Sequence, residues 1–451
     1  MTSSASNAGA LPQRLGVWSA ATIVVGIIVG SGIFRVPSSI AALTGSTGTM
    51  ALLWILGGLI TLCLALSLAE LAAMYPRSGG NYVYLREAYG PGVAFVYGWT
   101  FLLINPAVWA GISLILAEYL GHFVPLDSGE QRLAAAAVIA FASVANCFSV
   151  RFAVAIQNIA TAAKAAALFA VAGAIFALGS TGSGSFNQPV TFDAPSYGSL
   201  GVALVSVLFA YEGVVSFCAL SGEVRDPDRS LPRALTLGVL LVILLYLVIN
   251  AAYLYVLPLE SIISSKLVAA DAIQKVAGSA GAGIVAALVI LTTFGAVMAC
   301  AIADPRVFYA MAQDGQFFRA IGVVHPKLET PYLAVLLSGA IAIAYSSLHS
   351  FEELTAIFIL GLWPFYALGV LGVIVLRLKQ PQLARPYRTP CYPLVPAIFL
   401  AASSLVLVNS LIEQPRVTLL NLSITLAGVP VYYIWRKFGL RRAAAKQAQA
   451  T

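Results

Sequence analysis

The sequence predicts an all-α integral membrane protein with twelve transmembrane helices. Of its 451 residues, 60% are hydrophobic and 10% are charged, whereas about a quarter of the residues in an ordinary soluble domain are charged. Lipid solvates this much apolar surface and water does not. The apolar residues also fall into long runs, so the lipid bilayer is the first partner that the chain requires.

Twelve runs are long enough to cross the hydrocarbon core, which takes about 20 residues of α-helix. They span residues 16–44, 49–73, 91–120, 132–149, 152–178, 199–221, 234–257, 282–312, 332–348, 353–377, 393–412 and 417–436. We expect residues 1–13 to form a disordered tail, residues 14–438 a single transmembrane domain and residues 439–451 a second tail. The five cysteines show no metal-ligand spacing, so we expect neither a metal nor a cofactor.

Basic residues predict the orientation of the chain. If the N-terminus is cytoplasmic, nearly all lysines and arginines of the connections and tails fall on the cytoplasmic side, and the opposite side holds only Arg132, Lys266, Lys275 and Arg416. This asymmetry follows the positive-inside rule. We therefore expect a multi-pass protein of the cell membrane with both termini in the cytoplasm. The rule also accounts for the net charge of +7 without a nucleic-acid partner.

The first apolar run contains Gly26, Gly30, Ser31 and Gly32 at mid-membrane depth. Gly26 and Gly30 have the spacing of a small-residue face that packs against another helix. The alternative is an interrupted helix, since each glycine costs up to about 1 kcal/mol in a helix interior. A half-helix that begins at Ser31 and Gly32 offers free backbone N–H groups to an anion. Exposed backbone at this depth is tolerated only around a cavity.

The sixth run contains Glu212 beside Gly213 in the middle of the span. A carboxylate at a helix centre costs about 2.5–3.5 kcal/mol on insertion scales. One interpretation is a protonated side chain packed within the bundle, and the other is a second interrupted helix. Interruptions in the first helix of two repeated units indicate an inverted-repeat transporter with a central site. The repeats would cover about 14–180 and 199–378, followed by two helices at about 392–437.

Five motifs, in this order along the chain, point to a known family. They are Gly30-Ser31-Gly32-Ile33-Phe34; Glu70 with Tyr75-Pro76-Arg77-Ser78-Gly79-Gly80-Asn81-Tyr82 and Glu87-Ala88-Tyr89-Gly90; Gly222-Glu223-Val224-Arg225-Asp226-Pro227 with Leu231-Pro232-Arg233-Ala234; Arg306 to Gly315 (RVFYAMAQDG) with His325-Pro326; and Arg385-Pro386-Tyr387-Arg388 with Tyr392-Pro393. Over residues 14–440 the chain resembles the amino acid–polyamine–organocation (APC) superfamily of permeases. The stretch 101–107 is similar to its bacterial L-amino-acid transporter branch. The resemblance implies the LeuT-like fold, with a 5+5 inverted repeat and interrupted helices 1 and 6.

The resemblance also implies a substrate site for an L-amino acid. The substrate carboxylate would bind N–H groups near Ser31 and Gly32, and its ammonium would bind carbonyl groups where both helices unwind. Phe209 is the implied aromatic gate. The implied substrate-binding residues are Ile28, Gly30, Ser31, Gly32, Asn105, Phe209, Ala210, Tyr211, Glu212 and Gly213. Two opposite polarities in one pocket suit a zwitterion, and we expect its side-chain preference to depend on the residues around Asn105, Glu212, Met298 and Trp363.

Lys164 lies in the fifth run, about twelve residues from its cytoplasmic end. At about 1.5 Å per residue it is about 18 Å deep, which is too deep for a lysine side chain to reach the interface. The family has a lysine here where sodium-coupled relatives hold an ion. We therefore expect the Lys164 ammonium to replace a coupling sodium ion.

Three charged residues keep more than one interpretation. Glu212 would pair with a cationic side chain of the substrate, carry a coupling proton, or be structural. Asp304, where relatives have a small residue, would pair with Arg306 or with a cation of a connection. Arg35 would be a partner in an extracellular gate or an arginine that reaches for the interface.

The predicted function is a sodium-independent secondary transporter of L-amino acids that works by alternating access as an exchanger. The alternatives are a proton-coupled symporter of amino acids or polyamines and, more distantly, an amino-acid sensor with the transporter fold. We expect no enzyme, since the three histidines lie in or near connections. Connection 121–131 lacks the cysteine through which animal relatives bind a glycoprotein subunit, so we expect no disulfide-linked heavy subunit.

Overall fold

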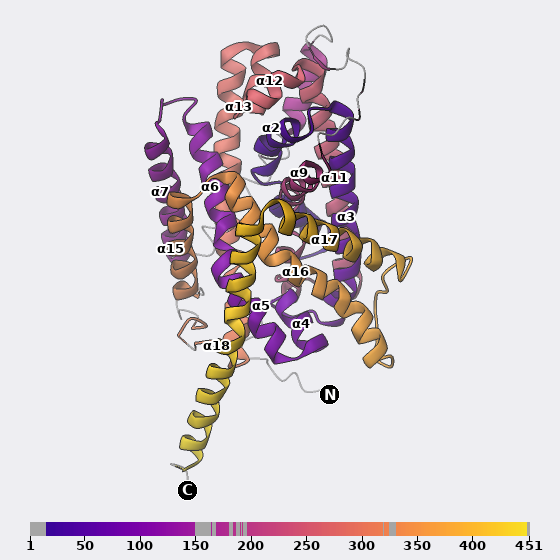
Figure 1. Cartoon of the computed structure of the whole chain (residues 1–451), viewed down its shortest axis with the longest axis vertical. Coiled ribbons are helices and arrows are strands. Elements are labelled where there is room, and N and C mark those ends of the chain that lie inside the picture. The colour runs from indigo at the N-terminus through magenta and orange to yellow at the C-terminus, as the bar shows by residue number, and fades with distance from the viewer. Residues whose placement is uncertain are drawn as a thin grey trace.

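The computed structural model describes residues 15–148, 164, 168–179, 184–185, 190, 192, 196–318, 320–323 and 331–448. The N-terminal tail predicted at 1–13, most of the fifth predicted span and the His325-Pro326 motif lie outside these residues. The described part of the chain is helical and contains no β-strand. The helices pack side by side into a bundle, and the last part of α18 extends beyond it (Figure 1).

Most of the helices overlap the predicted runs, whereas α4 and α12 lie between them. They are α1 (Val17–Ile28), α2 (Gly32–Thr44), α3 (Thr47–Met74), α4 (Asn81–Tyr89), α5 (Pro91–Ile104), α6 (Pro106–Leu120), α7 (Ser128–Phe148), α9 (Tyr197–Ala210), α10 (Val214–Cys218), α11 (Pro227–Val256), α12 (Leu259–Ser264), α13 (Val268–Ala303), α14 (Pro305–Gln313), α15 (Tyr332–Leu348), α16 (Phe351–Lys379), α17 (Leu394–Glu413) and α18 (Pro415–Ala448). A short apolar helix at Leu168–Leu178 belongs to the fifth predicted span.

Nine membrane spans are supported by length and composition in the described part of the chain. Eight are long apolar helices or nearly continuous helix pairs, and the bent pair α1–α2 makes the ninth. The other predicted spans correspond to α7, to Leu168–Leu178 and to α15, of which the last two are short apolar helices. The multi-pass helical architecture is therefore confirmed, whereas the count of twelve stays a prediction.

The first and sixth spans are interrupted, as one of the two interpretations of each run predicted. The chain leaves the helical conformation at Val29 (φ −71°, ψ 80°), and the axes of α1 and α2 differ by 45°. In the sixth span, α9 ends at Ala210 and α10 begins after Gly213, whose φ is 144°. A side chain is strained at such a positive φ, so Gly213 permits this break.

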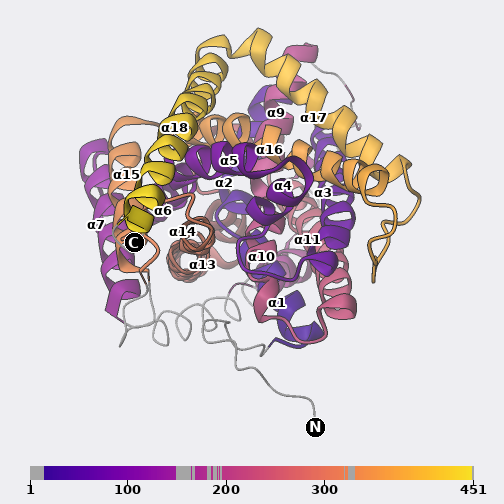
Figure 2. The same ribbon diagram turned by 90° about the horizontal axis from the view of Figure 1, so that it is seen from below.

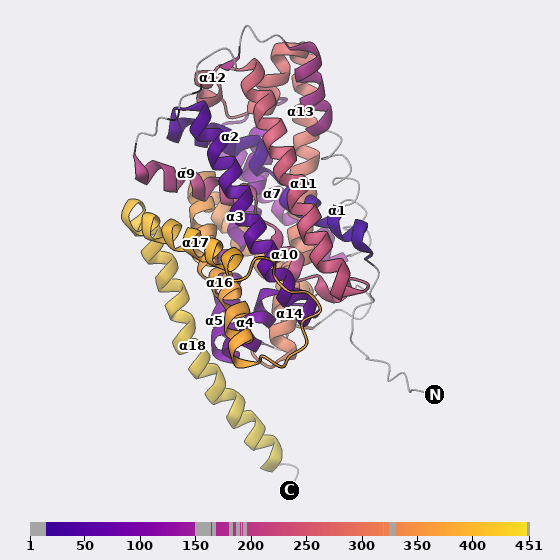
Figure 3. The ribbon, with the colours of Figure 1, turned by 90° about the vertical axis from the view of Figure 1, so that its right-hand side faces the viewer.

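The stretch 258–281, which lies between two of the predicted spans, is mostly helical. It contains α12 and the first third of α13, which begins at Val268 and not at residue 282. The helix has a kink at Gly278 (φ 67°), and this glycine and its charged neighbours gave the stretch the composition of a connection. Figure 3 shows α12 and this part of α13 above α2, at one end of the bundle. We call it the α12 end and the opposite one the α4 end.

The breaks of the first and sixth spans are buried in the bundle, and the last two helices lie outside it. α1 packs against α11 and α2 against α9, while α13 packs against α6. Seen from below, α17 and α18 run along one rim, beyond α5 and α16 (Figure 2). Many large apolar side chains of α17 and α18 are exposed, among them Leu405, Ile412 and Leu426. Such a surface is suited to lipid.

Candidate functional site

The two interruptions face one cavity of about 50 Å³ in the middle of the bundle. Eight of the ten expected substrate-binding residues line it, and all eight come from the two breaks. They are Ile28, Gly30, Ser31, Gly32, Phe209, Ala210, Glu212 and Gly213. The structure therefore brings together two stretches about 180 residues apart in the sequence.

The two breaks approach each other as closely as glycine allows. A Cβ atom added at Gly32 would lie 2.7 Å from the Cα atom of Ala210. A Cβ atom added at Gly213 would lie 2.8 Å from the side chain of Ile28. Since real Cβ atoms essentially never come this close, the glycines at these two positions let backbone meet backbone.

The beginning of α2 presents backbone donors that no other backbone group uses. In the described residues, the N–H groups of Ser31, Gly32 and Ile33 donate to no backbone carbonyl. The Ser31 hydroxyl is buried and has no hydrogen-bond partner there either. The first N–H groups of a helix and its dipole favour an anion. This wall of the cavity is therefore positive without a cationic side chain.

The ends of α1 and α9 supply carbonyl oxygens to the same site. Tyr246 of α11 has its hydroxyl 3.1 Å from the Ile28 carbonyl oxygen and 2.9 Å from the Ala210 carbonyl oxygen. The N–H group of Gly30 donates to the Ile28 carbonyl, and that of Glu212 to the Phe209 carbonyl. One tyrosine thus joins the last carbonyls of both first half-helices.

Two carboxylates line the cavity. Glu212 accepts a hydrogen bond of 3.2 Å from the Tyr366 hydroxyl. Asp304 accepts one of 2.5 Å from the Asn105 amide and one of 2.6 Å from the Trp109 indole N–H. These contacts correct the expected pairing of Asp304 with Arg306.

Arg306 points elsewhere. Its Nε atom lies 2.9 Å from Oε1 of Glu223, so this arginine is engaged on the other side of the helix break. Asp304 and Asn105 each stand directly before a proline that begins the next half-helix, α14 and α6 respectively. The hydrogen bond between these two side chains joins the α5–α6 junction to the α13–α14 junction.

Lys164 reaches the end of α1. Its ammonium donates a hydrogen bond of 2.8 Å to the Gly26 carbonyl, and only 3% of the residue is exposed. The burial agrees with the depth estimated from the sequence, at which the Lys164 side chain is too short to reach the interface.

Aromatic rings and an ion pair lie between the cavity and the α12 end. The ring of Phe209 makes edge contacts with Phe351 at 5.5 Å and with Phe358 at 6.0 Å between ring centres. Arg35 of α2 donates to Glu352 over 2.8 Å and lies 3.5 Å from Glu118. Arg35 is therefore paired, not extended toward an interface.

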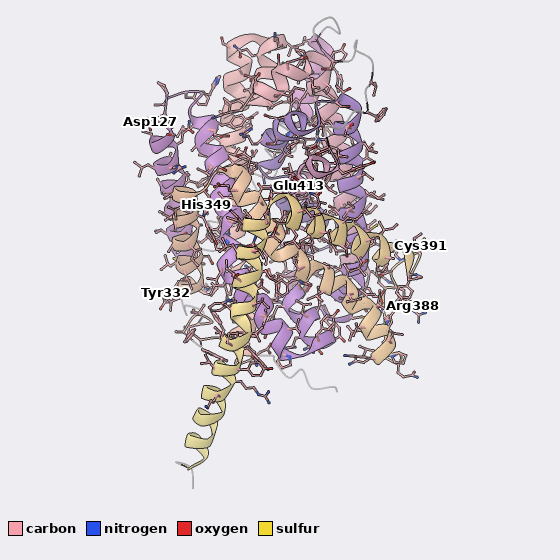
Figure 4. All side chains as sticks on the ribbon, in the orientation of Figure 1. Asp127, Tyr332, His349, Arg388, Cys391 and Glu413 are labelled. Carbon is pink, nitrogen blue, oxygen red and sulfur yellow. The ribbon has the colours of Figure 1, made fainter. Side chains whose placement is uncertain are left out.

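The α4 end has its own polar contacts. Asp314, which follows α14, accepts hydrogen bonds from Arg86 and, over 3.0 Å, from the Tyr82 hydroxyl. Figure 4 shows Arg388 near this end and Asp127 near the other.

Some residues expected at the site lie elsewhere. The Tyr211 hydroxyl turns away and donates to the Trp54 carbonyl, and Asn105 touches the cavity only through Asp304. Met298 packs against Ile112, and Trp363 packs against Tyr366. The sequence did not identify nine other lining residues, which are Ile27, Val108, Ile112, Ser216, Ala296, Ala299, Cys300, Ala303 and Asp304. The small residues of α13 at helical spacing were the available signal.

Two interrupted helices that meet at a central cavity in an apolar helical bundle define the LeuT-like class of membrane transporters. Comparison with known proteins gives the family. A family model described as amino acid permease matches residues 15–433. The chain belongs to this amino acid permease family, in agreement with the resemblance carried by the five motifs.

Three relatives illustrate the range of the family. The serine/threonine exchanger SteT of Bacillus subtilis is 30% identical over 95% of this chain and 98% of its own length. The b(0,+)-type amino acid transporter 1 of Mus musculus is 31% identical over 95% and 89%. The large neutral amino acids transporter small subunit 2 of Oryctolagus cuniculus is 34% identical over 94% and 81%.

Proposed function

We propose that this chain moves L-amino acids across the cell membrane by alternating access, independently of sodium, as an exchanger. The observation that carries the proposal is the meeting of free N–H groups and carbonyl oxygens at one cavity. The carboxylate of an amino acid binds at Ser31 and Gly32, and its ammonium binds near the Ile28 and Ala210 carbonyls. Such a site uses the ends of half-helices for both charges of a zwitterion.

Exchange is the mode that SteT carries in its name, since it is a serine/threonine exchanger. In an exchanger, the loaded protein changes its open side and the empty one does not. Phe209 and the Arg35 contacts close the site on one side, and the Asp314 contacts close it on the other. Movement of the interrupted helices against α6 and α16 opens one closure at a time.

Lys164 supports independence from sodium. Its ammonium binds the Gly26 carbonyl next to the first break, at the position where the family resemblance implies a sodium ion in coupled relatives. A fixed positive charge already occupies that place, so a metal ion has no role there.

The basic α4 end faces the cytoplasm in this proposal, with both chain termini on that side. Asp127 and His349 then face outward. Two relatives differ in what they suggest about partners, because one is called a small subunit and SteT carries no such name. The chain works without a disulfide-linked subunit, since no cysteine lies at 121–131.

The test is uptake of labelled amino acid into liposomes that contain the purified protein. We expect uptake to require unlabelled amino acid inside and to be equal in sodium and in choline buffers. A strict need for sodium contradicts the proposal, and binding without any flux supports a sensor. Lys164→Ala should abolish uptake, whereas Lys275→Ala, an exposed lysine of α13, should not.

The role of Glu212 decides whether the site favours cationic or neutral amino acids. If its carboxylate pairs with a cationic side chain, Glu212→Gln reduces uptake of lysine and spares uptake of alanine. An equal loss for both amino acids excludes that role. A proton-coupled symporter is the second candidate function, and it is favoured by the two carboxylates that line the cavity.

A further inference from the structure

A second cavity, of about 230 Å³, lies between α3 and α11 near the α12 end. These two helices pack side by side (Figure 3). From α3 the cavity is lined by Met50, Ala51 and Trp54, and from α11 by Asn250 and Leu254, among others. It is more than four times as large as the central cavity of about 50 Å³, and the two cavities share no lining residue. The second cavity is therefore separate from the substrate site.

The cavity reaches the apolar outer surface of the bundle. Ala51, which lines it, is exposed. Next to it on α3, Leu52 and Ile55 are exposed, and so is Leu244 on α11. Both helices are long and apolar enough to cross a membrane. Trp54 lies seven residues after the beginning of α3, which is about 10 Å along the helix. The cavity thus lies in the half of the bilayer on the α12 side, where lipid reaches it.

The inner wall of the cavity carries a hydrogen-bond donor and an acceptor that are both unused. Nε1 of Trp54 and Oδ1 of Asn250 have no hydrogen-bond partner in the described part of the chain. Trp54 is fully buried, and Asn250 is 5% exposed. Buried polar atoms in proteins nearly always have a partner. This wall therefore suits a ligand that can accept one hydrogen bond and donate another.

Both side chains are fixed by contacts behind the wall. The ring of Trp54 makes edge contacts with Tyr211 at 5.8 Å and with Tyr246 at 5.4 Å between ring centres. Nδ2 of Asn250 donates a hydrogen bond of 2.8 Å to the Tyr246 carbonyl. The indole and the amide are thus held before a ligand arrives, which lowers the entropy cost of binding.

The lining defines the chemistry of the ligand. No charged side chain lines this cavity in the described residues, and burial of an ionised headgroup without a partner is costly. The walls other than Trp54 and Asn250 are mostly apolar, so they suit a hydrocarbon chain. A hydroxyl group is a donor and an acceptor at once. One hydroxyl on an apolar body therefore matches both the polar and the apolar parts of the cavity.

We propose that this cavity binds a neutral lipid with a single hydroxyl group, of the class of long-chain alcohols, which enters from the half of the bilayer on the α12 side. The lipid oxygen accepts a hydrogen bond from Nε1 of Trp54, and the lipid hydroxyl donates one to Oδ1 of Asn250. The chain lies against Met50 and Leu254. The site does not depend on amino-acid transport, because it has its own cavity and its own polar groups.

The test is photolabelling of the full-length protein in nanodiscs of phosphatidylcholine. The probe is dodecanol with a diazirine on its chain, and labelled peptides are identified by mass spectrometry. We expect labels on the peptides that contain Met50 and Leu254. Excess 1-dodecanol should remove them, whereas dodecane or dodecanoate at the same membrane concentration should not. Equal competition by dodecane overturns recognition of the hydroxyl group. Labels spread evenly over α17 and α18 as well show an adventitious lipid contact only, and also overturn the proposal.

Two variants of the lining sharpen the test. Trp54→Phe removes the indole N–H, which has no partner in the described residues, so we expect this variant to fold and to bind 1-dodecanol about fivefold more weakly. Ala51→Phe places a ring in the cavity and should abolish labelling. Ile55→Phe, one turn further along α3 and outside the cavity, should be labelled like the wild type. Wild-type labelling and competition in either lining variant overturn the proposal.

These measurements use binding and not flux. A failure to label the cavity leaves the proposed transport function intact. Conversely, absence of amino-acid exchange in liposomes refutes the proposed function and leaves the lipid site standing.

Discussion

Arg35 of α2 is bound to Glu352 of α16, with 2.8 Å between Nη2 and Oε1. This contact joins the second half of an interrupted helix to a helix that is continuous, on the α12 side of the cavity. Glu118 of α6 stands on the other side of the guanidinium, at 3.5 Å. If the interrupted helices move, the arginine must leave both carboxylates. Breaking this contact is therefore part of opening the cavity on the α12 side.

Arg35→Ala should open the α12 side more often. The Glu352 side chain is 52% exposed, so the pair contributes at most about 1 kcal/mol, and its loss changes the open population about fivefold. Cys300 is half-buried and lines the cavity. The rate at which a membrane-impermeant maleimide modifies Cys300, read by peptide mass spectrometry, should rise about fivefold. As a control, Arg132→Ala removes only a bond to the Ser347 carbonyl and should leave that rate unchanged. An unchanged rate in Arg35→Ala would show that the pair has no gating role.

Gly32→Ala should destabilise the protein by about 1–3 kcal/mol, the usual cost of an overpacked core. The added Cβ atom meets the Ala210 backbone at 2.7 Å, and backbone does not move aside. Gly30→Ala is the matched control, because its nearest neighbour is the Ile28 oxygen at 3.8 Å. The unfolding temperature measured in detergent should be well below that of Gly30→Ala in the Gly32→Ala variant. Equal unfolding temperatures would show that the two breaks are not in contact.

Tyr246→Phe should lower stability by about 1–3 kcal/mol, the cost of buried carbonyls that lose a donor. It also leaves the Ile28 and Ala210 carbonyls with no bridge between them. Tyr253→Phe, two turns further along α11, tests the specificity of the effect. Tyr253 is equally buried, but its hydroxyl has no partner in the described part of the chain. Chemical denaturation should separate the two variants, and a similar loss in both would contradict the bridge.

Glu70→Gln should be the most destabilising of these changes, at about 3–5 kcal/mol. Glu70 is 1% exposed and accepts bonds of 2.9 and 2.6 Å from Arg377 and of 2.7 and 2.8 Å from Thr389. Its loss leaves the guanidinium of Arg377, whose side chain is 20% exposed, without this counter-charge. Glu87→Gln, which breaks a half-exposed pair with Arg86, should cost less than about 1 kcal/mol. Unfolding curves of the two variants check the difference, and near-equality refutes it.

The two interruptions could be predicted because their causes are local. Glycines beside Ser31 and a carboxylate beside Gly213 disturb a helix whatever surrounds them. Lys164 could be placed by depth alone, because a lysine far from both interfaces must find a carbonyl within the bundle.

The remaining lining could not be predicted, because it depends on how helices are rotated about their axes. Met298 was expected near the site and Cys300 was not, but of the two only Cys300 lines the cavity. The partner of Asp304 is Asn105, about 200 residues away, and nothing local favours it over Arg306. Helix α13 also begins earlier than expected, since a glycine kink within a helix has the same composition as a connection.

The hydroxyl of Tyr246 has one hydrogen and lies between two carbonyl oxygens, those of Ile28 and Ala210, so it donates to only one of them at a time. A primary ammonium has three hydrogens and can satisfy both at once. A quaternary ammonium has none. In the proposed site, betaines would therefore be rejected although they match amino acids in net charge. The discrimination comes from counting donors rather than from measuring size.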